Sequence, residues 1–154
     1  MGFRIRGLPA EPFAELFSLP DGALAARGAV RQVADQTPGY PCRISLTDAA
    51  VGEEVILVHH EHHAVDSPFR SSHALYVREG EQTFDAVGRV PEMLRSRLLS
   101  LRAFDAQGML LDADVVDGRG MEVLIERLFA DARVAYIHVH FARPGCYAAV
   151  VERA

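Results

Sequence analysis

The chain contains no tryptophan, only two cysteines, and no apolar run near the ~18 residues that a membrane-spanning helix needs. Most of its four tyrosines and eight phenylalanines stand in apolar segments, so few rings are free to stack on bases. The net charge is −5, with acidic and basic residues mixed along the chain, which leaves no basic field for nucleic acid. We therefore expect neither nucleic acid nor a membrane as a partner.

The sequence also shows no sign of an export signal or of a disulfide framework. The N-terminal stretch MGFRIRGLPAEPF has no apolar segment of signal-peptide length, which indicates a cytoplasmic protein. Two cysteines are too few for a disulfide framework, and in the cytoplasm both are expected to be reduced thiols. No repeat, low-complexity tract, linker or nucleotide-binding glycine motif is present. With 154 residues, 49% of them hydrophobic, residues 1–154 are predicted to form a single globular domain.

The predicted elements change character after the first forty residues. Residues 2–8 alternate apolar and basic side chains, as in an edge strand, whereas 11–19 and 21–34 have apolar residues at helical spacing. After a break at 35–41 that contains Pro38 and Pro41, the pattern becomes that of strands. The predicted strands are 42–46, 53–61, 73–79, 97–105, 109–117, 134–141 and 146–152.

One amphipathic helix, predicted over 120–132, interrupts these strands. Strands joined by short turns do not alternate with helices, which argues against a doubly wound nucleotide-binding fold. The sequence predicts an α+β fold: a single domain with a mainly antiparallel sheet, N-terminal helices and one helix before a C-terminal hairpin.

Four ordered segments carry a resemblance to a known family. They are PGYPCRISLTDAAVGEEVILV, EHHAVDSPFRSSHALYVRE, RLLSLRAFD and YIHVHFARPGCYAAVVERA. The set resembles the bacterial domain-of-unknown-function family catalogued under number 1203, over nearly the full chain. The resemblance implies no activity, ligand or catalytic residue. In one departure, the family pattern often reads His-Asn-Ala where this chain has His140, Phe141 and Ala142, so any binding by such an Asn is absent here.

Seven histidines are clustered at three places: four in the segment HHEHH (59–63), then His73, then the pair His138 and His140. Because strand side chains alternate between faces, His138 and His140 share a face, and His60 shares one with His62. If the two strands are neighbours, a site for zinc or iron with three or four nitrogen ligands becomes possible, with Glu61 as a carboxylate partner. The spacing lacks H-x-x-x-H or C-x-x-C, and a solvated strand end is the alternative.

The cysteines are possible nucleophiles with a histidine as base. Pairing 134–141 with 146–152 as an antiparallel hairpin predicts two faces. One carries Ile137, Val139, Phe141, Cys146, Ala148 and Val150, and the other carries His138, His140, Tyr147 and Ala149. In this register Cys146 packs as a small core residue away from both histidines, unless a bulge at Gly145 turns it. Cys42 lies at a strand entrance beside Arg43, a cation that favours a thiolate, yet packing is the commoner role of such a residue.

Three arginines, Arg43, Arg70 and Arg102, stand in separate segments of the family-like set. A guanidinium offers a planar fork for a carboxylate or phosphate, and the Ser-rich loop containing Ser67 and Arg70 suits an anion. Structural ion pairs, for example with Glu61 or Asp48, are the alternative. We expect Arg70, Arg102 and at least one of His62, His138 and His140 to converge on one concavity.

The leading interpretation is a pocket that binds a small anionic molecule without a cofactor. Its ligand-binding residues would be Arg43, Arg70, Arg102 and Ser67, and general acid/base catalysis, if any, would use His62, His138 or His140. A second hypothesis is a metal-dependent hydrolase or oxygenase with zinc or iron on the same three histidines. A third is a noncatalytic interaction module, with strand edges that form a homodimer or bind a partner.

Overall fold

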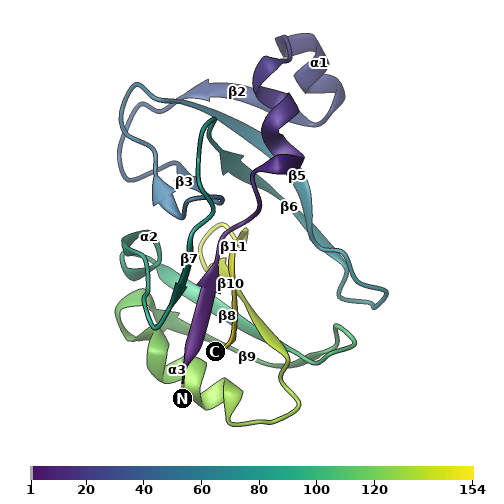
Figure 1. The fold of residues 1–154 in the computed structure, drawn as a ribbon, viewed down its shortest axis with the longest axis vertical. Coiled ribbons are helices and arrows are strands. Elements are labelled where there is room, and N and C mark those ends of the chain that lie inside the picture. Colours follow the sequence, from purple (N-terminus) through teal and green to yellow (C-terminus); the bar gives the residue numbers. More distant parts are fainter. Residues whose placement is uncertain (1) are drawn as a thin grey trace.

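Two sheets make up the architecture of the computed structural model, which describes residues 2–154 (Figure 1). The larger sheet has the order β7 (Asp85–Val87), β1 (Phe3–Arg6), β11 (Tyr147–Arg153), β10 (Tyr136–Phe141), β8 (Leu98–Phe104) and β9 (Leu110–Asp117). The smaller sheet has the order β2 (Ala29–Val33), β5 (Glu54–His63), β6 (Ser71–Val77), β3 (Pro41–Cys42) and β4 (Thr47–Asp48). All the pairs are antiparallel except β3 with β6, which confirms the predicted α+β class.

The helices are few and short. The first is a 3-10 helix, η1 (Glu11–Ser18), followed by α1 (Asp21–Ala26), α2 (Glu92–Arg95), a short 3-10 turn η2 (Gly118–Gly120) and α3 (Met121–Phe129). The predicted helix before the C-terminal hairpin is confirmed as α3, which buries Met121, Leu124, Ile125, Leu128 and Phe129. None of the helices in residues 2–154 is long and apolar enough to cross a membrane.

The larger sheet buries both of its faces in its centre. On β10, Ile137, Val139 and Phe141 belong to the apolar cluster that includes the buried residues of α3. The alternate residues His138 and His140 are also buried, on the opposite face, where the two sheets meet. Tyr147 of β11 joins a second apolar cluster with Phe13, Ile56 and Val58, which come from η1 and β5. The histidines of β10 therefore lie between the sheets.

The prediction of one helix over 21–34 is wrong. The helix α1 ends at Ala26, and residues 29–33 form β2, which pairs with β5. Gly28 adopts φ +66°, a left-handed conformation that glycine tolerates and that ends a helix. The apolar spacing of this segment fits a helix. The helix nevertheless ends at the glycine, and residues 29–33 instead form hydrogen bonds with the edge of β5, which would otherwise lack a partner strand there.

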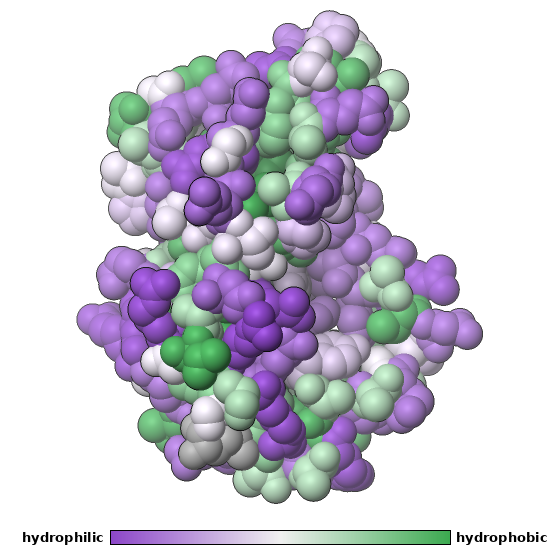
Figure 2. Space-filling model, in the orientation of Figure 1, coloured by the Kyte–Doolittle hydropathy of each residue, from purple (hydrophilic) through white to green (hydrophobic). Residues whose placement is uncertain are grey.

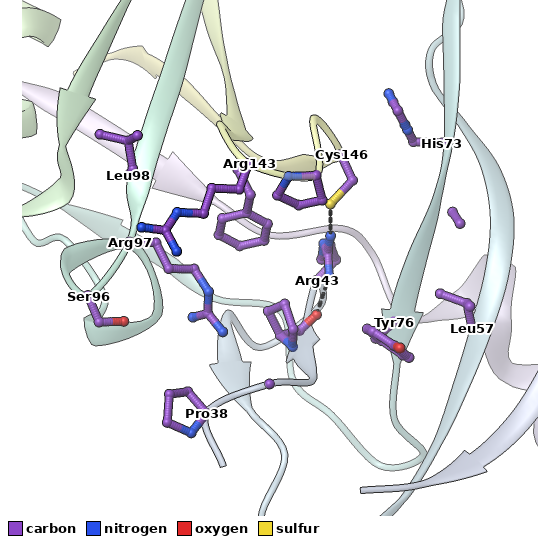
Figure 3. A pocket seen from close by; sticks show the side chains of 15 residues that line it. Pro38, Arg43, Leu57, His73, Tyr76, Ser96, Arg97, Leu98, Arg143 and Cys146 are labelled. Carbon is purple, nitrogen blue, oxygen red and sulfur yellow. Dashed lines mark hydrogen bonds between the residues drawn. The ribbon is translucent and has the colours of Figure 1, made fainter. Parts of the chain in front are cut away.

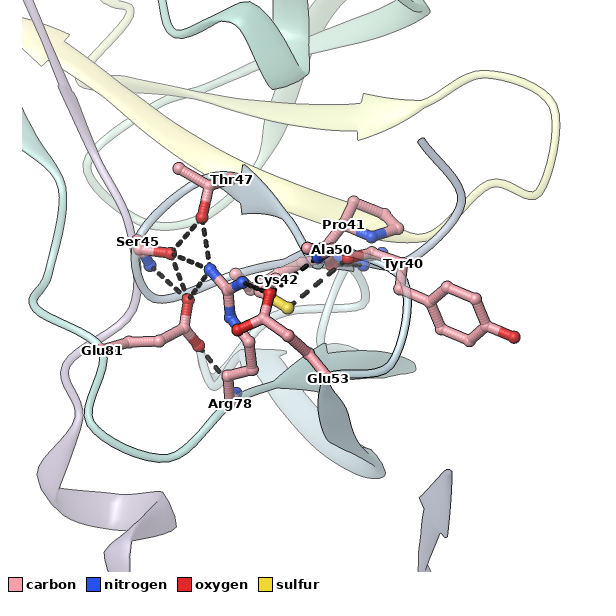
Figure 4. A network of polar contacts seen from close by, with 10 residues as sticks. Tyr40, Pro41, Cys42, Ser45, Thr47, Ala50, Glu53, Arg78 and Glu81 are labelled. Atoms are coloured by element: carbon pink, nitrogen blue, oxygen red, sulfur yellow. Dashed lines mark hydrogen bonds and ion pairs between the residues drawn. The ribbon is translucent and has the colours of Figure 1, made fainter. Parts of the chain in front are cut away.

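The predicted strand 42–46 is reduced to β3, Pro41–Cys42, because the chain turns at once through a loop to β4. Polar contacts hold this loop to the end of β6 (Figure 4). Arg78 donates to Glu53 at 2.6 Å and to Thr47 at 2.6 Å, and Glu81 accepts from the Ser45 hydroxyl. The fixed loop holds Arg43 beside the turn that connects β10 and β11.

The C-terminal hairpin is confirmed, with one change of register. Its strands pair His138 with Val150 and Val139 with Ala149, but a bulge follows, and His140 pairs with Tyr147. Cys146 packs against the cluster of Val139 and Phe141, and Tyr147 faces the histidines, as predicted. The predicted faces of Ala149 and Val150 are wrong, because the extra residue in β11 reverses the alternation beyond it.

Hydrophilic side chains cover most of the face of the molecule seen in Figure 2, whose outline narrows between the upper and lower halves. Large apolar side chains are exposed at separate places, among them Val33, Val51, Val87 and Val123. Isolated exposed side chains of this kind are ordinary on protein surfaces.

Candidate functional site

Three histidines from the two sheets meet at one point. His138 and His140 project from β10, and His62 projects toward them from the end of β5. One ring nitrogen from each of these histidines can be chosen so that all three lie within 4.8 Å of one another. The His62 ring centroid lies 5.2 Å from that of His140 and 6.0 Å from that of His138. In residues 2–154 no carboxylate belongs to this group.

The hydrogen bonds of these rings leave nitrogen lone pairs free. The Nδ1 atom of His140 lies 2.9 Å from the Gly145 carbonyl oxygen. Since a carbonyl can only accept, Nδ1 carries the proton and Nε2 keeps its lone pair. The Nδ1 atoms of His62 and His138 are buried and have no hydrogen-bond partner among residues 2–154. Buried polar atoms without partners are rare, and they indicate either strain or a missing ligand.

Burial keeps the three imidazoles uncharged. Desolvation, followed by the neighbouring histidines, lowers the pKa of His62 from 6.5 to about 3 and that of His138 to about 2. Desolvation also lowers the pKa of His140 to about 4, although its bond to Gly145 acts in the opposite direction. These values differ from the unperturbed 6.5 expected of a general base at neutral pH. Neutral imidazole is the form that ligates metal ions.

Two more histidines and one tyrosine surround the group, and the sequence interpretation assigned none of them to a site. His63 Nδ1 lies 2.8 Å from the Phe69 carbonyl oxygen, so its Nε2 accepts from the Tyr136 hydroxyl at 2.7 Å. The His63 and His138 ring centroids are 4.8 Å apart, and His73 stacks on His62 at 5.8 Å. Strict alternation places His63 opposite His62, but a bulge between His60 and His63 brings both toward β10.

A cavity of about 240 Å³ opens beside the three histidines. Its wall includes His62, His138, His140 and Arg102, with Phe69 and Phe104 among the apolar residues. Arg102 reaches the site because it pairs with His138 across β8 and β10 and shares its face. The only hydrogen bond of its guanidinium within residues 2–154 is a 3.4 Å contact from Nε to the Ser100 hydroxyl, and burial lowers the pKa of Arg102. This guanidinium thus faces the histidines without an acidic partner.

The three candidate arginines do not share this cavity. Arg43 is buried elsewhere, in contact with the Tyr147 and Pro41 carbonyls and the Cys146 sulfur. Arg70 is exposed and donates to the Val65 carbonyl at 3.2 Å, outside the residues that line the histidine cavity. The expected convergence of Arg70 with Arg102 is therefore wrong: Arg102 alone of the three lies beside the histidines.

Other candidates have structural surroundings. Ser67 donates to the Gly108 carbonyl and accepts from the Phe69 amide, which fixes the loop between β5 and β6. Glu61 is exposed, so it is not the carboxylate partner expected for a metal site. Asp48 pairs with Arg97, not with one of the candidate arginines.

The two cysteines are unpaired, as predicted. Cys42 is fully buried, and desolvation, followed by Glu81, raises the pKa of its thiol to about 12, so Arg43 does not make it a thiolate. Cys146 is partly buried and lies 2.9 Å from Arg43 Nη2. Neither sulfur makes a hydrogen bond to a histidine within residues 2–154, which removes the geometric basis for a Cys-His nucleophile.

Comparison with protein-family models gives a match over most of the chain. The model of a family described as protein of unknown function, DUF1203, matches residues 39–153. All the residues of the histidine group and Arg102 lie within the matched range. Neither the curated proteins nor the solved structures contain a match.

Proposed function

Since the matched range spans most of the chain, the protein belongs to the DUF1203 family, and we propose that it binds a metal ion, zinc in particular, through His62, His138 and His140. We further propose that the bound ion, together with Arg102, acts on a small anionic molecule. The observation that carries the proposal is the meeting of three ring nitrogens within 4.8 Å, two of the rings having a buried and unpartnered Nδ1.

The donor set favours zinc over iron. One class of catalytic zinc sites has three neutral imidazole ligands and a fourth position that is open to water or substrate. The common type of non-haem iron site needs a carboxylate ligand as well as histidines. Zinc–nitrogen bonds of about 2.0–2.1 Å in a tetrahedral arrangement put the nitrogens roughly 3.3–3.4 Å apart. The most widely separated nitrogens need to draw together by up to about 1.4 Å from their present limit of 4.8 Å, a shift that side-chain rotations supply. The Gly145 carbonyl orients His140, as carbonyls often do behind a metal-bound histidine.

The cavity supports an anionic substrate of small size. All three histidines line it, so an open coordination position is accessible from it. Its volume of about 240 Å³ is below the range of typical drug-sized pockets. Arg102 supplies a fixed positive charge and a planar fork, which match a carboxylate or a phosphate.

A bound zinc ion would supply Lewis acidity and a water of lowered pKa, which is the chemistry of metal-assisted hydrolysis. The chain's own residues contribute position and charge. Arg102 holds the anionic group of the substrate next to the histidines, and Phe69 and Phe104 limit the access of bulk water from their side. The uncharged imidazoles of His62 and His138 remain available as ligands at neutral pH.

The test is a metal analysis of protein purified without a histidine tag. We expect about one equivalent of zinc per chain in the wild-type protein, as isolated or after incubation with zinc and desalting. His62→Ala and His138→Ala should each retain less than a tenth of this amount. His59→Ala, an exposed histidine of the same strand, is the matched control and should bind as the wild type does.

Two results would contradict the proposal. One is a wild-type protein that holds neither zinc nor iron after reconstitution, including anaerobic reconstitution with iron(II). The other is a stoichiometry that His62→Ala and His138→Ala leave unchanged, which would assign the metal to surface groups. An activity on a small anion that chelators do not reduce would instead favour a metal-free pocket.

A further inference from the structure

A second cavity, of about 700 Å³, lies between the β3 loop, β6, and the turn that connects β10 and β11. Arg43, Arg97, Arg143 and Cys146 provide polar groups in its wall, and Leu57, Leu98 and Tyr76 are among the apolar residues (Figure 3). The volume is within the range of pockets that hold small organic molecules. His73 separates this cavity from the histidine group, because it lines the cavity and stacks on His62.

Arg43 is the unusual feature of this cavity. Its side chain is 1% exposed, and its guanidinium donates to the Tyr147 carbonyl at 2.8 Å, the Pro41 carbonyl at 2.5 Å and the Cys146 sulfur at 2.9 Å. Within residues 2–154 it forms no ion pair with a carboxylate, although its neighbour Arg97 is paired with both oxygens of Asp48. Burial lowers the pKa of Arg43, and Cys146 opposes this effect. A buried cation without a counter-ion costs several kcal/mol.

The cavity can provide the missing counter-charge from a ligand. Figure 3 shows the Arg43 guanidinium at the wall between Cys146 and the β3 loop, with Arg97 and Arg143 grouped on one side and Leu57 and Tyr76 on the other. Arg143 is exposed and makes no ion pair among the described residues. The cavity thus combines an apolar wall with two guanidinium groups, those of Arg43 and Arg143, that have no carboxylate partner among the described residues.

We propose that this cavity is a binding site for a small organic anion with an apolar body, such as an aromatic carboxylate or phosphate monoester. Arg43 and Arg143 bind the anionic group, and the apolar residues contact the body. The site is separate from the proposed metal centre, so either can fail without the other.

Cys146 provides a reporter at the wall of the site. Iodoacetate and iodoacetamide alkylate a thiolate by the same step, in which sulfur bonds to carbon and iodide leaves, but only iodoacetate is an anion. An attraction of about 1 kcal/mol raises the relative rate of iodoacetate by about fivefold. We expect the iodoacetate/iodoacetamide rate ratio at Cys146 to be about fivefold higher in the native protein than in the urea-unfolded protein. Peptide mapping separates Cys146 from Cys42, which is buried.

Variants and competitors make the test specific. Arg143→Ser, at an exposed position, should lower the ratio toward its unfolded value. Arg119→Ser, whose side chain is 80% exposed and paired with Asp117 outside the cavity, is the matched control and should not change it. Phenyl phosphate should slow alkylation of Cys146 by either reagent, whereas the neutral benzyl alcohol at equal concentration should not.

Equal native and unfolded ratios, without protection by phenyl phosphate, would overturn the proposal. If Cys146 resists both reagents in the native protein, thermal unfolding decides. Phenyl phosphate should then raise the melting temperature of the wild type and of Arg119→Ser but not that of Arg143→Ser. A wild-type melting temperature that phenyl phosphate leaves unchanged would likewise refute the site.

Discussion

The role of each clustered histidine depends on which of its ring nitrogens is free of a hydrogen bond. His63 has both ring nitrogens engaged, by the Phe69 carbonyl and the Tyr136 hydroxyl, so it is a structural residue although it lines the histidine cavity. His140 has one nitrogen engaged, and His62 and His138 each have a buried Nδ1 without a partner in the part of the chain that the structure describes. A cluster of histidines thus divides into one residue that packs and three that can bind.

Arg43 contributes to stability as well as to the second cavity. We predict that Arg43→Met lowers the free energy of unfolding by about 2–4 kcal/mol, because the Tyr147 and Pro41 carbonyls lose their charged donor in a buried setting. Urea unfolding followed by circular dichroism measures this change. Arg70→Met, at an exposed position with one hydrogen bond to Val65, is the control and should change stability by less than about 0.5 kcal/mol. Equal effects of the two changes would show that Arg43 has no special role in stability.

At the scale of elements, the crossing from β1 to the smaller sheet depends on a glycine. The Gly7 amide donates to the Phe84 carbonyl, and a Cβ at Gly7 would lie 2.1 Å from the Ile44 carbonyl oxygen and 2.9 Å from that of Arg43. The backbone of the Arg43 loop must therefore move away if any side chain is added.

We predict that Gly7→Ala destabilises the protein by more than about 3 kcal/mol, since backbone atoms cannot give way as a flexible side chain can. Gly80→Ala is the matched control. Gly80 has φ +79° and open space around it, so its substitution meets backbone strain alone, about 1–2 kcal/mol. Unfolding in urea compares both variants with the wild type. A Gly7→Ala protein as stable as Gly80→Ala would mean that the loop shifts at little cost.

The alternation of side chains along strands predicts part of the fold and of the histidine site, and bulges limit this prediction. Period-two alternation predicts β10 and β11 and the shared face of His138 and His140, because an antiparallel hairpin preserves that alternation. It misplaces Val150 because a bulge adds one residue to β11, and a bulge has no reliable sequence signature. The same limitation conceals that His63 joins His62.

Pairing between distant strands is the other limit. Arg102 lies beside His138 because β8 and β10 are paired strands. Arg70 lies elsewhere, because its side chain is hydrogen-bonded to the Val65 carbonyl within its own loop. Both arginines stand in comparable polar surroundings in the sequence, so tertiary contacts alone separate them. The histidine group was predicted only on the condition that its two strands are neighbours. That condition is wrong, because β5 and β10 lie in different sheets, and it is the packing of the two sheets that brings His62 to His138 and His140.

At the scale of the whole molecule, the proposed metal centre joins the two sheets, with His62 from one and His138 and His140 from the other. An ion that binds only the folded chain stabilises it by about 2.7 kcal/mol at a free concentration 100 times its Kd. For a chain of this size, we predict a rise in melting temperature of roughly 5–10 °C with zinc.

The rise should depend on the ligands and not on exposed histidines. His59→Ala should show the full increase, and His62→Ala and His138→Ala should show none. Differential scanning fluorimetry with zinc, and with magnesium as a control ion, measures the change. An equal response in all these proteins would point to nonspecific binding.

The pH dependence of the metal-free protein gives a further whole-molecule prediction. His62, His138 and His140 have folded-state pKa values below 6.5: about 3 for His62, about 2 for His138 and about 4 for His140. Below pH 6.5 the unfolded chain therefore binds protons that the folded chain does not, so acidification favours unfolding. The stability these neutral histidines allow is fully present above pH 6.5 and is lost progressively as the pH falls.

Between pH 6.5 and 5 the carboxylates contribute little, because their ordinary pKa values lie near 3.8 and 4.5 and most of them are therefore ionised even in the unfolded chain. In that window each histidine can lower the free energy of unfolding by at most about 1.4 kcal/mol per pH unit, and His62, which is the least buried, by less because of solvent screening. We predict a clear fall in the urea midpoint of the protein in chelator from pH 6.5 to 5. His138→Phe, which keeps an apolar ring in the space, should have a visibly flatter profile, and His59→Gln should have the wild-type slope. A wild-type profile that is flat across this window would show that the histidines are not kept neutral by burial, and it would remove the electrostatic support for their role as ligands.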